Sequence, residues 1–170
     1  MTLAGSLHII PSLKYSSAAA VATSTEQLFA TALLEATIAS GTGANQMDLI
    51  WEDTRALAAS TGEDLDLAGG LTDAFGTTLT FVKVKLIWIS AASANGSTIS
   101  VGGASATQFV NWVANASDIV KVRPGGCMLL YAPDATGYGV TAATGDLFKI
   151  LNDDGAAGAT YSIIIGGTSA

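Results

Sequence analysis

Residues 78–89 read TLTFVKVKLIWI and alternate between two sets of side chains. Period-two alternation places Val82, Val84, Leu86 and Trp88 on one face of a strand, and Leu79, Phe81, Lys83, Lys85, Ile87 and Ile89 on the other. At strand rise, twelve residues span about 40 Å. Both faces are largely apolar, which is typical of a central strand that is covered on both sides.

Shorter candidate strands surround this run. We expect them at 47–57, 63–67, 97–101, 107–113, 119–122, 127–132, 138–141, 147–151 and 160–165. Gly, Pro, Asn and Asp separate these runs at intervals of about 8–12 residues, a spacing typical of sandwiches and barrels. The sequence therefore predicts an all-β fold, a β-sandwich or jelly-roll-like antiparallel domain with an extended N-terminal arm.

Turn chemistry gives more specific expectations. Asn95-Gly96 predicts a tight hairpin between residues 86–91 and 97–101, because both turn positions favour positive φ. Asn152-Asp153-Asp154-Gly155 predicts a second hairpin turn, and Phe75 is expected to anchor the loop 68–76 in the core. The single cysteine, Cys127, cannot form an intrachain disulfide and is expected to be a small buried hydrophobe at a strand start.

The N-terminal residues have a different character. Residues 1–24 are interpreted as an arm or edge strand, since Pro11 would interrupt a central strand; residues 25–170 form a single all-β domain. Within 16–20 a helix is an alternative on alanine propensity. Residues 28–38 alternate with period two, which favours a strand, although residues 24–27 could cap a helix. The arm residues that we expect to contact a partner subunit are Leu7, Ile9, Ile10, Leu13 and Tyr15.

The chain is poor in charge. Only 12% of its residues are charged, against roughly 25% in an ordinary soluble domain, and the net charge is −7. Nucleic-acid binding depends on clustered Lys and Arg that release counterions, and the chain has only seven of these residues. We therefore expect no nucleic-acid partner, and a surface that is partly covered by other subunits.

Reactive side chains are scarce as well. His8 is the single histidine and lies between two apolar residues, so neither a zinc site nor a catalytic triad is indicated. The acidic groups at 63–66 and 152–155 lack the ligand spacing of an EF-hand. The carboxylates of 63–66 are expected to point outward into solvent, and 152–155 is explained by its predicted turn. Gly41-Thr42-Gly43 lacks the lysine of a phosphate-binding loop. The sequence thus predicts no enzyme, no cofactor and no bound metal.

Three tryptophans (Trp51, Trp88 and Trp112) could form a sugar-stacking platform, but such residues are more often core or interface anchors. Residues 86–117 are free of charge, yet Asn, Gln and Gly interrupt them, which excludes a membrane helix. The first 14 residues show neither a basic segment nor a long apolar one. We therefore expect no secretory signal and no membrane association.

Several turn-rich segments resemble small structural proteins of tailed bacteriophages. They are GTGANQ (41–46), EDLDLAGGLTDAFG (63–76), VRPGG (122–126), APDATGY (132–138), GDL (145–147) and IIIGGTS (163–169). The likeness covers roughly residues 40–170. It implies a virion component made in the host cytoplasm, and in particular a capsid decoration (cement) protein that forms homotrimers and binds the major capsid protein.

Two other functions remain open at this point. The first is a head-fibre, tail or receptor-binding component that meets the host surface. The second is a carbohydrate-binding β-sandwich module, for which the three tryptophans are the candidate residues.

Overall fold

The computed structural model describes residues 3–9, 12–18, 23–29, 34–103 and 106–170, and all regular elements within them are strands. The strands are β1 (Gly5–Ile9), β2 (Ser12–Ala18), β3 (Thr23–Phe29), β4 (Leu34–Ser40), β5 (Gln46–Met47), β6 (Leu49–Leu57), β7 (Gly62–Asp66), β8 (Ala68–Thr72), β9 (Thr78–Thr80), β10 (Lys83–Ala91), β11 (Ile99–Gly102), β12 (Ile119–Val122), β13 (Cys127–Tyr131), β14 (Tyr138–Gly139), β15 (Leu147–Asn152) and β16 (Ala159–Thr168). The expected all-β class is confirmed.

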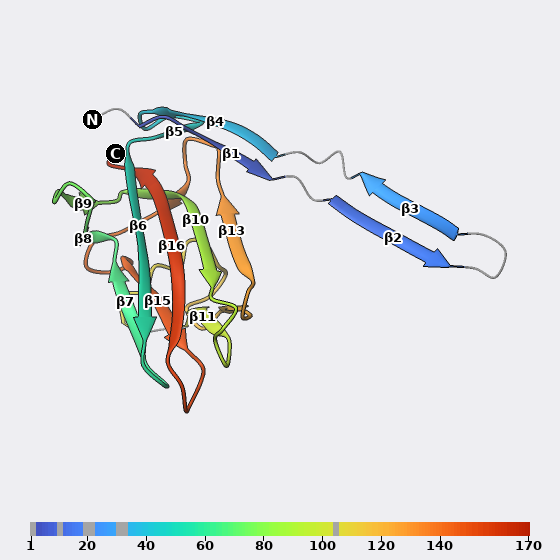
Figure 1. The fold of residues 1–170 in the computed structure, drawn as a ribbon. Coiled ribbons are helices and arrows are strands. Elements are labelled where there is room, and N and C mark those ends of the chain that lie inside the picture. Colours follow the sequence, from blue (N-terminus) through green and yellow to red (C-terminus); the bar gives the residue numbers. More distant parts are fainter. Residues whose placement is uncertain (1–2, 10–11, 19–22, 30–33, 104–105) are drawn as a thin grey trace.

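Two antiparallel sheets form the body of the molecule (Figure 1). One has the order β13-β10-β16-β6, with β14 also paired to β10, and the other has the order β12-β11-β15-β7. Their facing side chains share one hydrophobic core, which includes Ile87, Ile163 and Tyr161 from the first sheet and Val101 and Phe148 from the second. Sandwich-like packing of this kind matches the alternation along each strand.

The run 78–89 supplies the central strand, as predicted, but not as one strand of twelve residues. It divides at Phe81 into β9 and β10, because the Phe81 N–H bonds to Leu67 while the Val82 N–H bonds to Thr168. A bulge between Val84 and Leu86 then shifts the register. Val84 therefore faces the core. The prediction that Val84 shares a face with Leu86 and Trp88 is wrong.

Most of the other expected strands are present. Strands occupy the regions predicted at 47–57, 63–67, 119–122, 127–132, 147–151 and 160–165, and a short one lies in 138–141. Residues 107–113 are turns rather than a strand, with one bridge between Gln108 and Leu147. The prediction of a strand there is wrong.

Both predicted hairpins are wrong. β10 pairs with β13, β14 and β16, whereas β11, which follows Asn95-Gly96, pairs with β12 and β15 in the other sheet. Neither Asn95 nor Gly96 has positive φ. Instead the Asn95 amide donates to the Thr160 carbonyl at 2.9 Å and accepts from the Thr160 N–H at 2.8 Å. Residues 153–158 likewise carry the chain from β15 to β16 across the sandwich.

An N-terminal ribbon made of β1, β2, β3 and β4 extends from the body (Figure 1). β1 pairs antiparallel with β4, and β2 pairs antiparallel with β3. Within the described residues the segment 28–38 is extended, so the strand interpretation is confirmed over 28–29 and 34–38. The division of the chain at residue 24 stays a prediction; β3 spans that position and belongs to the ribbon.

Candidate assembly surfaces

The far end of the ribbon, β2 with β3, is the arm of this molecule. These two strands form a sheet of their own, and Figure 1 shows them projecting away from the side of the body that carries β7, β8 and β9. Of the predicted contact residues, Leu7 and Ile9 lie in β1, and Leu13 and Tyr15 lie in β2. Leu7 is half-buried, and Ile10 lies outside the described residues. Their contact role stays a prediction.

The base of the ribbon is tied to the body by a buried cation. Lys85 is 0% exposed, and its ammonium donates to the carbonyls of Gly43 at 2.8 Å and Gln46 at 3.0 Å. Burial lowers the pKa of this ammonium below its ordinary value. The Asn45 N–H adds a bond to the Pro133 carbonyl at 2.7 Å. The loop after β4 is therefore fixed against β10, although alternation alone did not indicate that Lys85 is buried.

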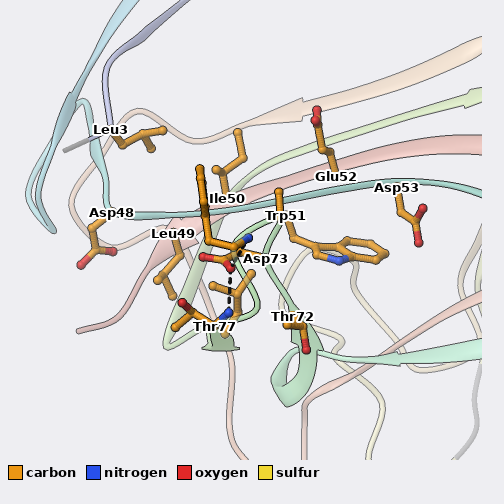
Figure 2. Close-up of a pocket in the computed structure, with 13 residues that line it drawn as sticks. Leu3, Asp48, Leu49, Ile50, Trp51, Glu52, Asp53, Thr72, Asp73 and Thr77 are labelled. Atoms are coloured by element: carbon orange, nitrogen blue, oxygen red, sulfur yellow. Dashed lines mark hydrogen bonds between the residues drawn. The ribbon is translucent and has the colours of Figure 1, made fainter. Parts of the chain in front are cut away.

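A groove of about 1080 Å³ runs beside β6 (Figure 2). Asp48 and the five β6 residues 49–53 line it, together with Leu3 and residues 72–75, 77 and 79. Consecutive strand residues point to opposite faces, so a groove lined by all of them follows the edge of the strand. Ile50 stands at this groove and is 43% exposed.

The loop between β8 and β9 forms the opposite wall of the groove. Asp73 Oδ1 accepts hydrogen bonds from the N–H groups of Phe75 at 2.9 Å and Thr77 at 2.8 Å. This turn holds Phe75 outward, where 75% of it is exposed. The prediction that Phe75 anchors the loop in the core is wrong.

Charge at the groove is negative. Asp48, Glu52, Asp53 and Asp73 contribute to its lining. Asp48 accepts hydrogen bonds from Ser169, and Asp53 forms an ion pair with Arg55 at 2.8 Å. The side chain of Glu52 has no hydrogen-bond or ionic partner within the described part of the chain. Glu52 is thus a carboxylate open to a partner outside this chain.

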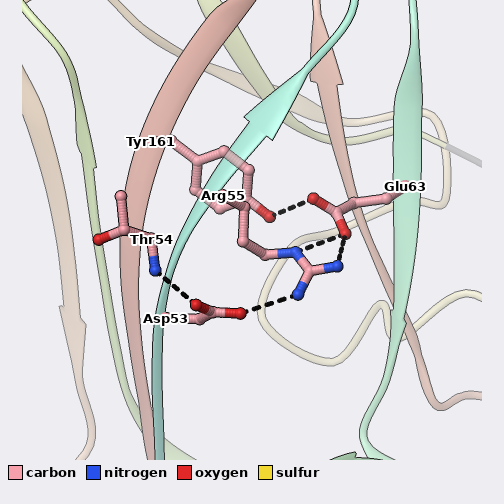
Figure 3. Close-up of polar contacts among 5 residues, drawn as sticks. All are labelled: Asp53, Thr54, Arg55, Glu63 and Tyr161. Atoms are coloured by element: carbon pink, nitrogen blue, oxygen red, sulfur yellow. Dashed lines mark hydrogen bonds and ion pairs between the residues drawn. The ribbon is translucent and has the colours of Figure 1, made fainter.

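A polar cluster crosses between the two sheets near the other end of β6 (Figure 3). Arg55 Nε and Nη2 both lie 2.6 Å from Glu63 Oε2, and the Tyr161 hydroxyl donates to Glu63 Oε1 at 2.9 Å. Burial and the bond to Glu63 raise the pKa of Tyr161 well above its ordinary value. Glu63 shares the inward face of Leu65, so the prediction that its carboxylate points outward is wrong.

The acidic group at 152–155 is also occupied by structural bonds. Asn152 is fully buried and donates to the carbonyls of Ala58 and Ala157, each at 2.9 Å. Asp153 accepts from Thr98 at 2.7 Å and Ser100 at 2.8 Å. Burial opposes ionisation of Asp153, but these bonds and the Lys121 ammonium outweigh it, so its pKa is lowered. The loop is held in place by its own carboxylates.

The single cysteine and the three tryptophans do not lie together at one site. Cys127 is exposed, so its predicted burial is wrong. Trp51 belongs to the core, Trp112 packs edge-on against Phe148 with ring centroids 5.5 Å apart, and Trp88 lies half-buried on the opposite face of its sheet. The three tryptophans therefore do not form one platform.

Among the described residues, no group of three or more His, Cys, Asp or Glu side chains is arranged to hold a metal ion. The backbone of His8 lies in β1 opposite Glu35, and its side chain falls outside the description. The described part of the chain also contains no helix of the length and apolarity needed to cross a membrane.

Sequence reasoning missed the groove and its residues. Only one signal could have indicated it, namely Ile50 on the otherwise polar face of the β6 run. Comparison of the chain with protein-family models, with curated proteins and with solved structures finds no match.

Proposed function

We propose that this chain is a structural subunit of a virus particle, a decoration (cement) protein on the capsid of a tailed bacteriophage. The observation that carries the proposal is the arm: two paired strands that extend from the body. An isolated two-stranded ribbon is marginally stable in water, and this one gains stability when it lies on another subunit. A low content of charge lowers the desolvation cost of covering such a surface.

The resemblance of residues 40–170 to phage structural proteins supports the more specific part of the proposal. The partners are other copies of the chain, as a homotrimer, and the major capsid protein; the location is the virion. A net charge of −7 favours a basic patch on the shell and disfavours nucleic acid.

The mechanism is mass action. A protein that binds the assembled shell and not the loosened shell stabilises it by its differential binding free energy. In a trimer placed on a symmetry axis, three weak contacts act together, because the first contact raises the effective concentration of the other two. No covalent chemistry is needed for this role.

Quantitative mass spectrometry of purified virions tests the proposal. We expect hundreds of copies per particle, and particles stripped of this protein should disassemble at a lower temperature and recover when it is added back. Tens of copies or fewer would favour the head-fibre or tail role instead. Absence from purified particles would refute a virion role altogether.

A further inference from the structure

The groove beside β6 has the geometry of a strand-binding site. β6 is the last strand in the order β13-β10-β16-β6, and among the described strands it pairs with β16 alone. An edge strand presents backbone N–H and C=O groups without partners on its outer side. Because residues 49–53 line the groove from both faces of β6, this outer side opens into it.

The groove also offers side-chain contacts to an added strand. Phe75 and Ile50 are its large exposed apolar residues, and the Trp51 indole N–H makes no hydrogen bond to a described residue. At strand rise, the six residues 48–53 span about 20 Å, which matches a partner strand of six or seven residues. Peptide recognition by strand addition uses this combination of backbone pairing and side-chain pockets.

We propose that the arm of a second copy of this chain occupies the groove by pairing along the edge of β6. The arm has suitable dimensions, because β2 and β3 are each seven residues long and, within the part of the chain that the structure describes, each pairs only with the other. One edge of either strand is therefore open. The arm of the same chain leaves from the side of the body away from β8 and β9 (Figure 1), so the occupant comes from another molecule.

Charge supports this choice of occupant. Residues 1–40 contain three charged side chains, Lys14, Glu26 and Glu35, and Lys14 in β2 is the sole cation among them. Glu52 at the groove has no partner within the described residues and could receive this ammonium. A strongly acidic segment would be repelled by the four carboxylates at the groove.

The symmetry of the assembly follows from the geometry. An arm on one side and a groove on the other make a head-to-tail contact. Such a contact forms a closed ring when the rotation between successive copies divides evenly into a full turn. This inference rests on the proposed function in one respect, because both assume that the arm contacts another subunit. It concerns contacts between copies, not contacts with a capsid.

The test uses the purified full-length chain. Native mass spectrometry and sedimentation give the oligomeric state between about 1 and 100 µM. Phe75→Asp places a charge in the groove on an exposed loop, and Ile119→Asp, at a residue 48% exposed on β12 in the other sheet, is the matched control. Burial of a phenylalanine side chain is worth enough for Phe75→Asp to weaken association about tenfold or more. Ile119→Asp should not weaken it.

A second measurement locates the contact. Unlabelled and ¹⁵N-labelled chains are mixed and treated with a carbodiimide, which joins amines to carboxylates without a spacer. We expect cross-links from Lys14 to Glu52 or its neighbouring carboxylates that carry one labelled and one unlabelled peptide. A chain that stays monomeric throughout, an oligomer unaffected by Phe75→Asp, or cross-links from Lys14 confined to other surfaces would each overturn the inference.

The two proposals fail separately. If copies associate through the groove but purified virions lack the protein, the virion role is refuted and the arm-in-groove contact stands. If virions carry hundreds of copies and the isolated chain is monomeric, the decoration role stands and the contact between copies is refuted.

Discussion

The cluster of Glu63, Arg55 and Tyr161 joins the two sheets, and its removal gives a measurable loss of stability. Glu63→Gln keeps the shape of the side chain and removes its charge. The Tyr161 ring is fully buried, and a hydrogen bond to a charged partner contributes about 1.5–3 kcal/mol against about 1 for a neutral one. Replacing the carboxylate by an amide therefore weakens the Tyr161–Glu63 hydrogen bond by about 1 kcal/mol.

The ion pair adds a similar amount. The side chain of Arg55 is 37% exposed and that of Glu63 is 19% exposed, so solvent screening limits the contribution of the pair to about 1 kcal/mol. Together the two losses predict destabilisation by about 2 kcal/mol. For a chain of this length that corresponds to a fall in Tm of about 4–8 °C.

Urea denaturation and calorimetry measure the change, with Asp64→Asn as the control. Asp64 is the next residue on β7, is exposed, and has no side-chain partner within the described residues. A double-mutant cycle of Glu63→Gln with Tyr161→Phe isolates the coupling between the two side chains. If Glu63→Gln destabilises no more than Asp64→Asn, the cluster does not join the sheets as argued.

Three further outcomes are expected. Burial raises the pKa of both Tyr131 and Tyr161, and both groups are held protonated in the fold. Their contribution to stability should therefore be constant below about pH 10 and be lost as the pH rises further. Urea titrations above about pH 10 should show a smaller fall in stability for Tyr161→Phe. Asn95→Ala should lower the free energy of unfolding by about 1–3 kcal/mol, because it leaves the Thr160 N–H without its partner. The Thr160 carbonyl keeps its bond to the Ala92 N–H. Asn115→Ala, at an exposed loop residue, should change this free energy by less than about 0.5 kcal/mol, and equal effects of the two substitutions would contradict the bridging role of Asn95. Cys127 should react with a thiol reagent in the native protein at close to the rate of the unfolded chain; a reaction that waits for unfolding would contradict its exposure.

Much of the fold could be predicted from periodicity. Strand β10 and most of the strands around it were predicted, because alternation of apolar residues reports directly which side of a strand is covered. The sheet to which each strand belongs could not be predicted. Asn95-Gly96 is a strong local signal for a tight hairpin, but the side chain of Asn95 bonds to β16 instead, and the chain crosses to the other sheet.

The errors at single residues have a related cause. Hydrophobicity predicted burial for Phe75 and Cys127, and charge predicted exposure for Glu63. Their actual positions depend on partners distant in sequence or on a local turn: Asp73 holds the Phe75 loop outward, and Arg55 and Tyr161 meet Glu63 between the sheets. Lys85 lies at a bulge in β10, and its buried ammonium bonds to carbonyls of the loop 43–46. Such contacts are set by the tertiary fold.

The negative charge at the groove also affects which strands can pair with the edge of β6. Edge strands are commonly protected by Lys, Pro or a bulge, and the stretch 49–53 of β6, LIWED, has no Lys or Pro. If the β6 edges of two copies paired, the carboxylates of Glu52 and Asp53 in one copy would lie near those of the other. Like charges directly opposite each other are destabilising. A nearly uncharged arm with one lysine meets no such repulsion. The carboxylates of β6 therefore disfavour edge-to-edge pairing of two bodies while leaving the edge open to the arm.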